Sequence, residues 1–307
     1  MQKYVKDFLK YLYLERRYSP HTIRSYETDL RQFEIFLNDH FASQRIFWHL
    51  IDKKILRYFL IRLQEQGISR RSIGRKLATL KSFFRYLLKQ GIIEKNPAST
   101  VKMPKFEKKL PEYLTEEETQ NLLRLPNFKT FEGLRDLAIL ELLYGTGMRL
   151  SELINLRVSQ VDFKERLIRV IGKGNKERII PFGGSARLIL ERYLAIRPQY
   201  ADKTVDNLFV LKTGKKMYPV AVQRIVKKYL SQVSQIQKKS PHILRHTYAT
   251  HLLNAGADIR VVKDLLGHEN LSTTQVYTHL SIEHLKDIYN RAHPGALKKS
   301  SKNRRRS

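Results

Sequence analysis

A segment rich in proline and lysine interrupts the chain about one third of the way along. In NPASTVKMPKFEKKLPEYLTEEE, Pro97, Pro104 and Pro111 exclude a continuous helix, because proline has no N–H to donate and its ring clashes with the preceding turn. Four lysines favour exposure of the same segment to solvent: Lys102, Lys105, Lys108 and Lys109. The segment therefore indicates a linker between two domains.

The domain organisation follows from this break. The chain has 307 residues, of which 42% are hydrophobic, and this is enough for two domains that each bury a core. We place the first domain at 1–101, the linker at 102–111 and the second domain at 112–295. Residues 296–307 form a basic tail that ends in KKSSKNRRRS, and we expect this tail to be disordered because it has few apolar side chains to bury.

The net charge narrows the choice of partner. Lys and Arg total 58 against 29 Asp and Glu, which leaves a net charge of +29 and favours a polyanion, first of all nucleic acid. An anionic membrane surface is the alternative, but the N-terminal sequence has no apolar signal segment, and no stretch approaches the ~20 apolar residues that span a bilayer. We therefore expect a soluble protein with no membrane partner. The absence of cysteine excludes disulfides and cysteine nucleophiles and is compatible with the cytoplasm.

The first domain is predicted to be wholly helical. Ser19-Pro20 is typical of a helix start, and a further helix is predicted over 70–90. One side of that helix is apolar, with Ile73, Leu77, Leu80, Phe84, Leu87 and Leu88. The opposite side is cationic over an arc of about 120° and carries Arg71, Arg75, Lys81, Arg85 and Lys89.

Two interpretations of the cationic side remain open. It has no acidic residue to pair with, although alternating charges are usual on a solvated helix, so it is either a solvated surface or a phosphate-binding face. The residues that we assign to DNA contact are Arg70, Arg71, Arg75, Lys76, Lys81 and Arg85.

The second domain is predicted to combine helices with a small sheet. Residues 166–171 and 176–182 are β-prone and flank Gly172-Lys173-Gly174-Asn175, which predicts a hairpin with Lys173 at its tip. Short capped helices follow, from Ser240-Pro241 to Gly256, from Asp258 to Gly267, and from Ser272 onward. The expected fold class is mainly α with a small β-sheet.

Several side chains of the second domain are candidates for phosphodiester chemistry. His242 and Arg245 lie three residues apart near a predicted helix N-terminus, where backbone N–H groups favour an anion. Arg149 follows the glycines of GTGMRLSEL, and a structural salt bridge is the alternative role for it. His268 and Tyr277 lie in LLGHENLSTTQVYTHL, although a single tyrosine is most often a packing residue.

No metal site and no cofactor are predicted. His242 and His246 have the four-residue spacing of helical zinc ligands, but no glutamate follows the first histidine and no carboxylate cluster completes a coordination set. We expect His246 to be buried and hydrogen-bonded instead.

The order Arg149, Lys173, His242-x-x-Arg245, His268 and Tyr277 resembles the catalytic motif of the tyrosine recombinase (integrase) family. TGMRLSEL, GKGNKER, HILRHTYATHLLNAGADIRVVKDLLGH and STTQVYTH are similar to the corresponding segments of its Xer branch. ERRYSPHTIRSYETDLRQF and ISRRSIGRKLATLKSFFRYLLKQGIIEKNPA resemble the family's N-terminal domain, so the resemblance covers nearly the whole chain. The tail after Pro294, with Arg304-Arg305-Arg306, departs from the family pattern.

This resemblance implies a fold and a reaction. The fold is a helical core-binding (SAM-like) domain followed by an α+β catalytic domain, which together form a C-shaped clamp around DNA. In the reaction, Tyr277 attacks a DNA phosphodiester and stays joined to the 3′ phosphate, and the 5′ hydroxyl of the partner strand then reverses the step through a Holliday junction. Arg149 and Arg245 stabilise charge on the phosphate, and Lys173 protonates the leaving oxygen. The two histidines, His242 and His268, steer protons.

The resemblance also implies partners. Four protomers act on two double-stranded DNA sites in a tetrameric synaptic complex, with a second related recombinase and a septal DNA translocase, to resolve chromosome dimers at cell division in the bacterial nucleoid. A C-terminal helix at 281–291 carries an apolar stripe of Ile282, Leu285 and Ile288. Docking on a neighbouring protomer and packing on its own domain are both compatible with that stripe.

Other functions remain open from the sequence. An integrase or invertase of a mobile element would use the same chemistry. A DNA-binding regulator would keep the fold without the reaction, and a type IB topoisomerase would share the nucleophile and the cations.

Overall fold

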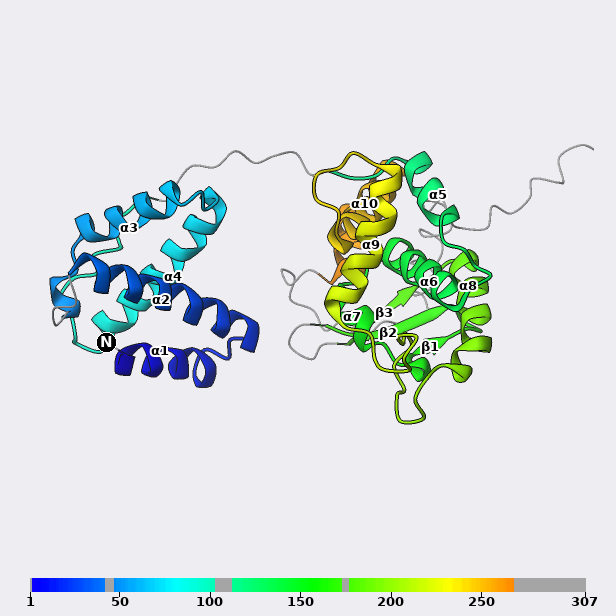
Figure 1. Cartoon of the computed structure of the whole chain (residues 1–307), viewed down its shortest axis with the longest axis horizontal. Helices are drawn as coiled ribbons and strands as arrows, with labels where there is room; N and C mark the ends of the chain where they lie inside the picture. The colour runs from blue at the N-terminus through cyan, green and yellow to red at the C-terminus, as the bar shows by residue number, and fades with distance from the viewer. Residues whose placement is uncertain (1, 42–46, 103–111, 173–176, 268–307) are drawn as a thin grey trace, which may run out of the picture. The chain divides into compact units, whose positions relative to one another are not determined.

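A computed structural model describes residues 2–41, 47–102, 112–172 and 177–267. The chain divides into two compact units, residues 1–109 and 110–307 (Figure 1). The predicted linker falls largely outside the described residues, as do the tip of the hairpin, the helix from Ser272, the helix at 281–291 and the tail. None of the helices described is long and apolar enough to cross a bilayer.

The first unit is built from helices in its described part. They are α1 (Gln2–Leu14), α2 (Pro20–His40), the 3-10 turn η1 (Trp48–Leu50), α3 (Lys53–Glu65) and α4 (Arg70–Lys89). Ser19, Asp52 and Ser69 each accept a hydrogen bond from a backbone N–H of the first turn that follows, which satisfies a donor that has no partner within the helix. The predicted start at Ser19-Pro20 is confirmed.

Aromatic and aliphatic side chains of these helices share one core. Phe8, Phe33, Phe83 and Phe84 are fully buried within it. On α4 the predicted apolar side is confirmed except at Leu88, which is 40% exposed. Leu88 lies at one edge of the apolar arc, and Phe83, beyond the opposite edge, is buried.

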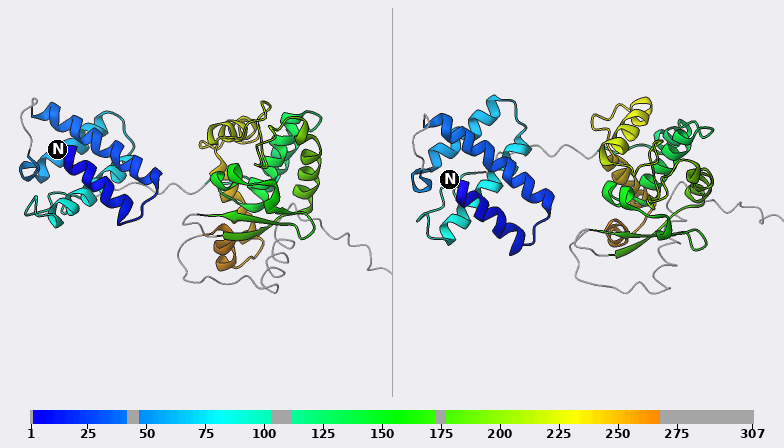
Figure 2. Two further views of the ribbon diagram at one scale, coloured as in Figure 1. Left: turned by 90° about the horizontal axis from the view of Figure 1, so that it is seen from below. Right: turned by 60° about the horizontal axis from the view of Figure 1, so that its bottom comes forward.

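The second unit combines helices with one small sheet (Figure 2). Before the sheet come α5 (Glu116–Arg124), α6 (Phe131–Thr146), α7 (Leu150–Asn155) and η2 (Val158–Gln160). The strands are β1 (Val161–Asp162), β2 (Leu167–Ile171) and β3 (Glu177–Pro181). After them come α8 (Gly184–Ile196), η4 (Arg197–Gln199), α9 (Pro219–Val233), α10 (Pro241–Asn254) and α11 (Ile259–Leu266). The predicted class, mainly α with a small sheet, is confirmed.

The sheet is antiparallel, in the order β1-β2-β3. Its β2–β3 pair is the predicted hairpin, and Val170 lies opposite Arg178 in the register. Because side chains alternate along a strand, Ile168, Val170 and Ile180 face the core together. Arg178 is on the same face as Ile180 and is buried with it.

Side chains of helix α10 hydrogen-bond the backbone of Leu114, near the start of the described part of the second unit. The Leu114 N–H donates to Thr247 Oγ1 at 3.0 Å, and His251 Nε2–H donates to the Leu114 carbonyl at 2.8 Å. On the other side of the ring, His251 Nδ1 is hydrogen-bonded to the Tyr144 hydroxyl at 3.0 Å. All four residues are buried, so both backbone groups of Leu114 are satisfied by side chains of one helix.

The boundaries predicted for the last two described helices are confirmed. Ser240 precedes α10, and Gly256 follows its end with a positive φ. Asp258 accepts from the Arg260 N–H at the start of α11, and Gly267 ends α11 in the left-handed conformation.

Candidate active site

Arg149 occupies a sharp turn between two helices. Helix α6 ends at Gly147, whose φ of 59° is left-handed, and Arg149 then takes the N-cap position of α7. Its backbone N–H donates to Glu152 Oε2 at 2.7 Å, and its Nη1 donates to Glu152 Oε1 at 2.9 Å. Its Nη2 donates to the Gly267 carbonyl at 2.6 Å. The salt bridge expected as the alternative role for Arg149 is therefore present, while its side chain stays 32% exposed.

Arg245 reaches the same place from α10. Its Nη1 donates to the Gly147 carbonyl at 2.6 Å and its Nη2 to the Leu266 carbonyl at 2.7 Å. Burial, together with the charges of Arg149 and Arg178, lowers the pKa of Arg245 to about 10, so the group is still cationic at neutral pH. The structure thus brings together the two arginines that the sequence assigned to phosphate binding.

The structure describes only one of the other four predicted catalytic residues, His242. His242 is exposed, one turn before Arg245 on α10. Lys173, His268 and Tyr277 lie outside the described residues, so their assignment stays a prediction.

Sequence reasoning missed a third arginine, Arg178 on β3. Its Nη1 and Nη2 donate to the two carboxylate oxygens of Glu152 at 2.7 and 2.8 Å, and its Nε donates to the Leu265 carbonyl at 3.2 Å. A signal for it was available, because the period of two places Arg178 on the face of Ile180, and a buried arginine needs hydrogen-bonding partners within the protein.

Glu152 is the anion that the arginines share. It is only 5% exposed, and burial by itself would raise its pKa. The hydrogen bonds and charges of Arg178 and Arg149 outweigh burial, so the pKa of Glu152 is lowered and the carboxylate is ionised.

The three arginines converge on the C-terminus of α11. The carbonyls of Leu265, Leu266 and Gly267 each accept from a different guanidinium, and cations are favoured there by the helix dipole. Three cations against one carboxylate leave an excess of positive charge beside Gly267, the residue before His268. Planar guanidinium groups can bind phosphate oxygens with two parallel hydrogen bonds, so this cluster is suited to a phosphodiester.

The histidines of α10 differ from expectation. His246 is only half-buried, and burial lowers its pKa. The histidine that is buried and hydrogen-bonded is His251, one turn later. Among the described residues no group of three or more histidines and carboxylates could hold a metal ion.

The α4 residues assigned to DNA contact are exposed apart from two lysines. Arg70, Arg71, Arg75 and Arg85 are exposed and Lys81 is half-buried. Lys76 departs from the prediction, because it is 5% exposed and its Nζ lies 2.9 Å from Oδ1 of buried Asp29 on α2.

Asp29 gives α4 a structural ion cluster. It accepts from Lys76, from Thr79 Oγ1 at 3.0 Å, and from Nη1 of Arg75, whose side chain is 49% exposed. Burial of Lys76 against α2 is incompatible with a direct phosphate contact in this conformation, so we assign Lys76 a structural role.

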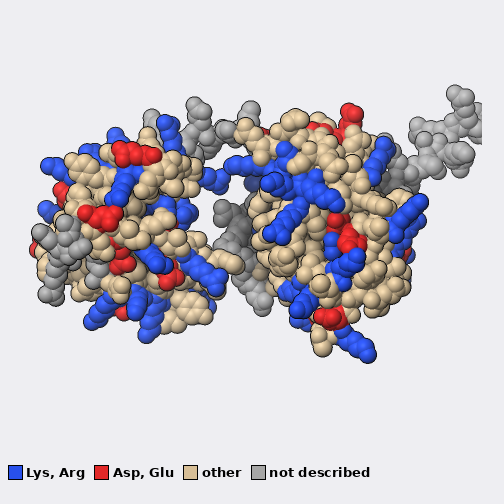
Figure 3. Space-filling view, in the orientation of Figure 1, with Lys and Arg blue, Asp and Glu red and all other residues tan. Residues whose placement is uncertain are grey.

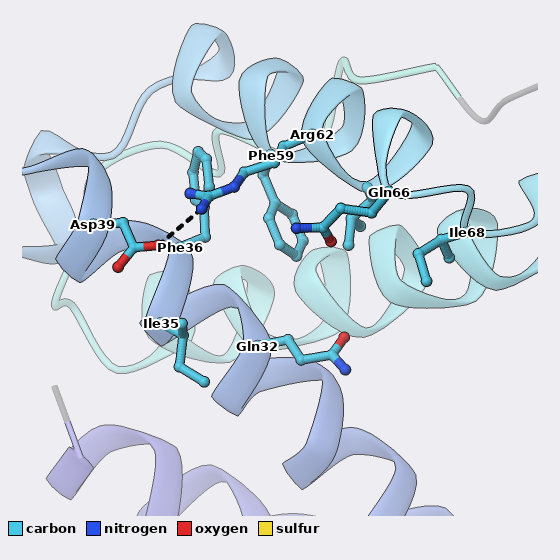
Figure 4. A pocket seen from close by; sticks show the side chains of 9 residues that line it. Gln32, Ile35, Phe36, Asp39, Phe59, Arg62, Gln66 and Ile68 are labelled. Atoms are coloured by element: carbon cyan, nitrogen blue, oxygen red, sulfur yellow. Dashed lines mark hydrogen bonds and ion pairs between the residues drawn. The ribbon is translucent and has the colours of Figure 1, made fainter.

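A hollow of about 180 Å³ lies between α2 and α3 of the first unit (Figure 4). Phe36 and Phe59 line it, and the ion pair of Arg62 with Asp39 crosses from one helix to the other. It contains none of the predicted site residues, and it is smaller than the roughly 300–1,000 Å³ of most small-molecule sites.

Comparison with known proteins assigns the chain to a family. Residues 112–284 match the model of the phage integrase family, and residues 5–91 match that of the phage integrase N-terminal SAM-like domain. The chain belongs to the phage integrase family. The resemblance stated from the motifs is therefore confirmed.

This integrase-family chain is similar to tyrosine recombinases, and the similarity extends over nearly its full length. XerC of Chlorobaculum parvum is 40% identical and covers 96% of this chain and 95% of the relative. XerC of Bacillus subtilis is also 40% identical, with 98% and 99% covered.

Solved structures of the family share the fold. The XerH recombinase in a pre-cleavage complex with its difH substrate has a TM-score of 0.67 and 25% identity, over 87% of this chain and 80% of that chain. The Tn1549 transposon integrase in complex with circular intermediate DNA has a TM-score of 0.70 and 21% identity, over 93% and 94%. The second likeness concerns the fold alone.

Proposed function

We propose that this protein is a site-specific tyrosine recombinase of the Xer type. The observation that carries the proposal is the convergence of Arg149 and Arg245 on the end of α11, in a chain whose relatives at 40% identity are tyrosine recombinases.

The reaction is a transesterification on DNA. The Tyr277 oxygen forms a bond to phosphorus while the bond from phosphorus to the 5′ oxygen breaks, and the strand stays joined to the protein through its 3′ phosphate. The tyrosine proton passes to a histidine, and Lys173 protonates the 5′ oxygen as it leaves. Arg149 and Arg245 bind the nonbridging oxygens, where charge builds up.

The second half of the reaction restores the DNA. The 5′ hydroxyl of a partner strand attacks the phosphotyrosyl ester, expels Tyr277 and creates a Holliday junction, so the energy of the phosphodiester is kept and no ATP is used. Repetition on the second pair of strands completes recombination.

DNA binding is shared by both units in this proposal. Lys and Arg side chains are spread over the visible face of each unit (Figure 3). In the first unit, the cationic side of α4 meets the phosphate backbone through Arg70, Arg71, Arg75, Lys81 and Arg85.

The likeness to Xer relatives supports a finer proposal. We place the protein at the bacterial nucleoid in the cytoplasm, in a tetramer on two DNA sites, with a second related recombinase and a septal translocase, where it resolves chromosome dimers. A single footprint near the replication terminus is the expected genomic result, whereas footprints at the ends of a mobile element would replace this role with integration.

A nicked suicide substrate tests the chemistry. A strand cut just upstream of its nick releases the short fragment that carries the 5′ hydroxyl, so the covalent adduct accumulates and is visible as a shifted band. We expect an adduct with the wild type and none with Tyr277→Phe. A folded wild-type protein that gives no adduct on its own recombination site, or an adduct that survives Tyr277→Phe, would contradict the proposal.

Salt dependence tests the α4 face. For each phosphate contact removed, the slope of log affinity against log salt should flatten by about 0.9, so Arg71→Ala with Arg75→Ala should flatten it by about 2. Arg62→Ala is the matched control, because Arg62 is an exposed arginine of α3 that is paired with Asp39. An unchanged slope in the double variant would assign the face to solvent.

A further inference from the structure

Arg178 is the most buried of the three clustered arginines. It is 7% exposed, and three of its N–H groups donate within the protein, two to Glu152 and one to the Leu265 carbonyl. An arginine in this state does not itself bind DNA, so its effect must pass through the groups that it holds.

Those groups are the two partners of Arg149. Glu152 accepts from Arg178 and from Arg149 at the same oxygen, Oε1. Gly267, whose carbonyl accepts from Arg149, lies against Arg178, since a Cβ added at Gly267 would be 3.2 Å from the Arg178 Cδ, Nε and Nη1 atoms. Arg178 therefore fills the space beside both partners of Arg149.

The charges give this arrangement a consequence. While Arg178 neutralises Glu152, the positive charge of Arg149 is not cancelled by the Glu152 carboxylate. Without Arg178, a buried carboxylate would retain Arg149 as its cation, because an unpaired buried charge is very costly. Arg149 would then have less attraction left for a phosphate.

We propose that Arg178 is a positioning residue for strand cleavage, which holds Glu152 and the turn at Gly267 so that Arg149 is available to the DNA phosphate. This inference rests on the proposed recombinase function. It assigns Arg178 no contact with DNA and no proton transfer.

The test uses the full-length protein and the nicked substrate at saturating protein concentration, with DNA affinity and thermal melting measured in parallel. Arg178→Met keeps much of the side-chain volume and removes the charge. We expect the rate of adduct formation to fall about 10- to 100-fold, by analogy with the outer-shell groups that orient the ligands of a metal centre, while the dissociation constant changes less than about twofold. Arg169→Met is the matched control, because Arg169 is exposed on the opposite face of the neighbouring strand β2, and it should cleave at the wild-type rate.

A second variant separates positioning from simple loss of folding. Glu152→Gln in the Arg178→Met background removes the unpaired carboxylate, while glutamine can still accept from the Arg149 N–H as the capping residue. The double variant should recover at least about fivefold in cleavage rate over Arg178→Met. If Arg178→Met does not fold, the inference is tested on the double variant alone. Its cleavage rate should then be within about tenfold of the wild-type rate.

Three results would overturn the inference. They are wild-type cleavage by folded Arg178→Met, a folded double variant that is no faster than folded Arg178→Met, and, where the single variant does not fold, a folded double variant without adduct. These differ from failure of the recombinase proposal, in which the wild type itself forms no adduct and both ideas fall together.

Discussion

Gly147 is a position beside the arginine cluster at which a single added methyl group should be strongly destabilising. Its φ of 59° is left-handed, and an added Cβ would lie 2.4 Å from Cδ1 of Tyr248 and 2.9 Å from Cδ2 of Leu266. The Tyr248 ring is fully buried, so it has no open space to move into. The left-handed backbone costs a non-glycine residue about 1–2 kcal/mol, and forcing a methyl group into a packed core costs about 1–3 kcal/mol more. Gly147→Ala should therefore lower the free energy of unfolding of the second unit by about 2–5 kcal/mol.

Gly256→Ala is the matched control for this prediction. Gly256 belongs to the same unit and has a φ of 86°, but nothing lies within 4 Å of its added Cβ. It should show the backbone cost alone, about 1–2 kcal/mol. Urea unfolding of the full chain, followed by a probe in the second unit, measures both variants against one transition.

The reasoning is refuted if the two alanine variants lose the same stability, since crowding at Tyr248 would then cost nothing. The two variants should also differ in the rate of adduct formation. Because the Gly147 carbonyl accepts from Arg245, Gly147→Ala should also slow adduct formation at a temperature where it is folded, while Gly256→Ala should not.

Three further predictions concern buried polar groups. Asp29→Ala leaves buried Lys76 without its carboxylate and should cost the first unit about 3–5 kcal/mol, whereas Asp39→Ala, which breaks an exposed ion pair, should cost at most about 1 kcal/mol in the same denaturant assay; equal losses would contradict the cluster. His251→Phe leaves the Leu114 carbonyl without its donor and should lower the stability of the second unit by about 1–3 kcal/mol, and a change under about 0.5 kcal/mol would count against that anchor. Burial raises the pKa of Glu141 above its ordinary 4.5, so the folded state holds the proton more tightly than the unfolded state, and stability falls as pH rises from about 4.5 through the raised pKa. Glu141→Gln removes this loss, so its melting temperature should gain on wild type between pH 4.5 and pH 7, and a constant difference would disprove the assignment.

Local signals were sufficient to predict much of the fold. Ser19, Ser240 and Asp258 occupy the N-cap positions of their helices, and the preference for such residues is set by the chain within a few positions. The hairpin of β2 and β3 was predictable for the same reason, because β-prone runs on both sides of a glycine-containing turn specify their own pairing.

The contacts between distant segments were not predictable in this way. The wheel of α4 already places Lys76 on the apolar side, four residues before Leu80, yet its partner Asp29 comes from a different helix. Arg178 likewise needs Glu152 from α7. A charged residue on an apolar face indicates a counterion elsewhere in the protein, but only the tertiary structure shows which residue supplies it.

Leu114 is a mechanical fixed point of the second unit. Both of its backbone groups are held by α10, the helix that carries His242 and Arg245. A pulling force applied to the chain ahead of Leu114 would act on α10 through these two hydrogen bonds. The helix that positions Arg245 would therefore bear part of any tension on the chain that enters the second unit.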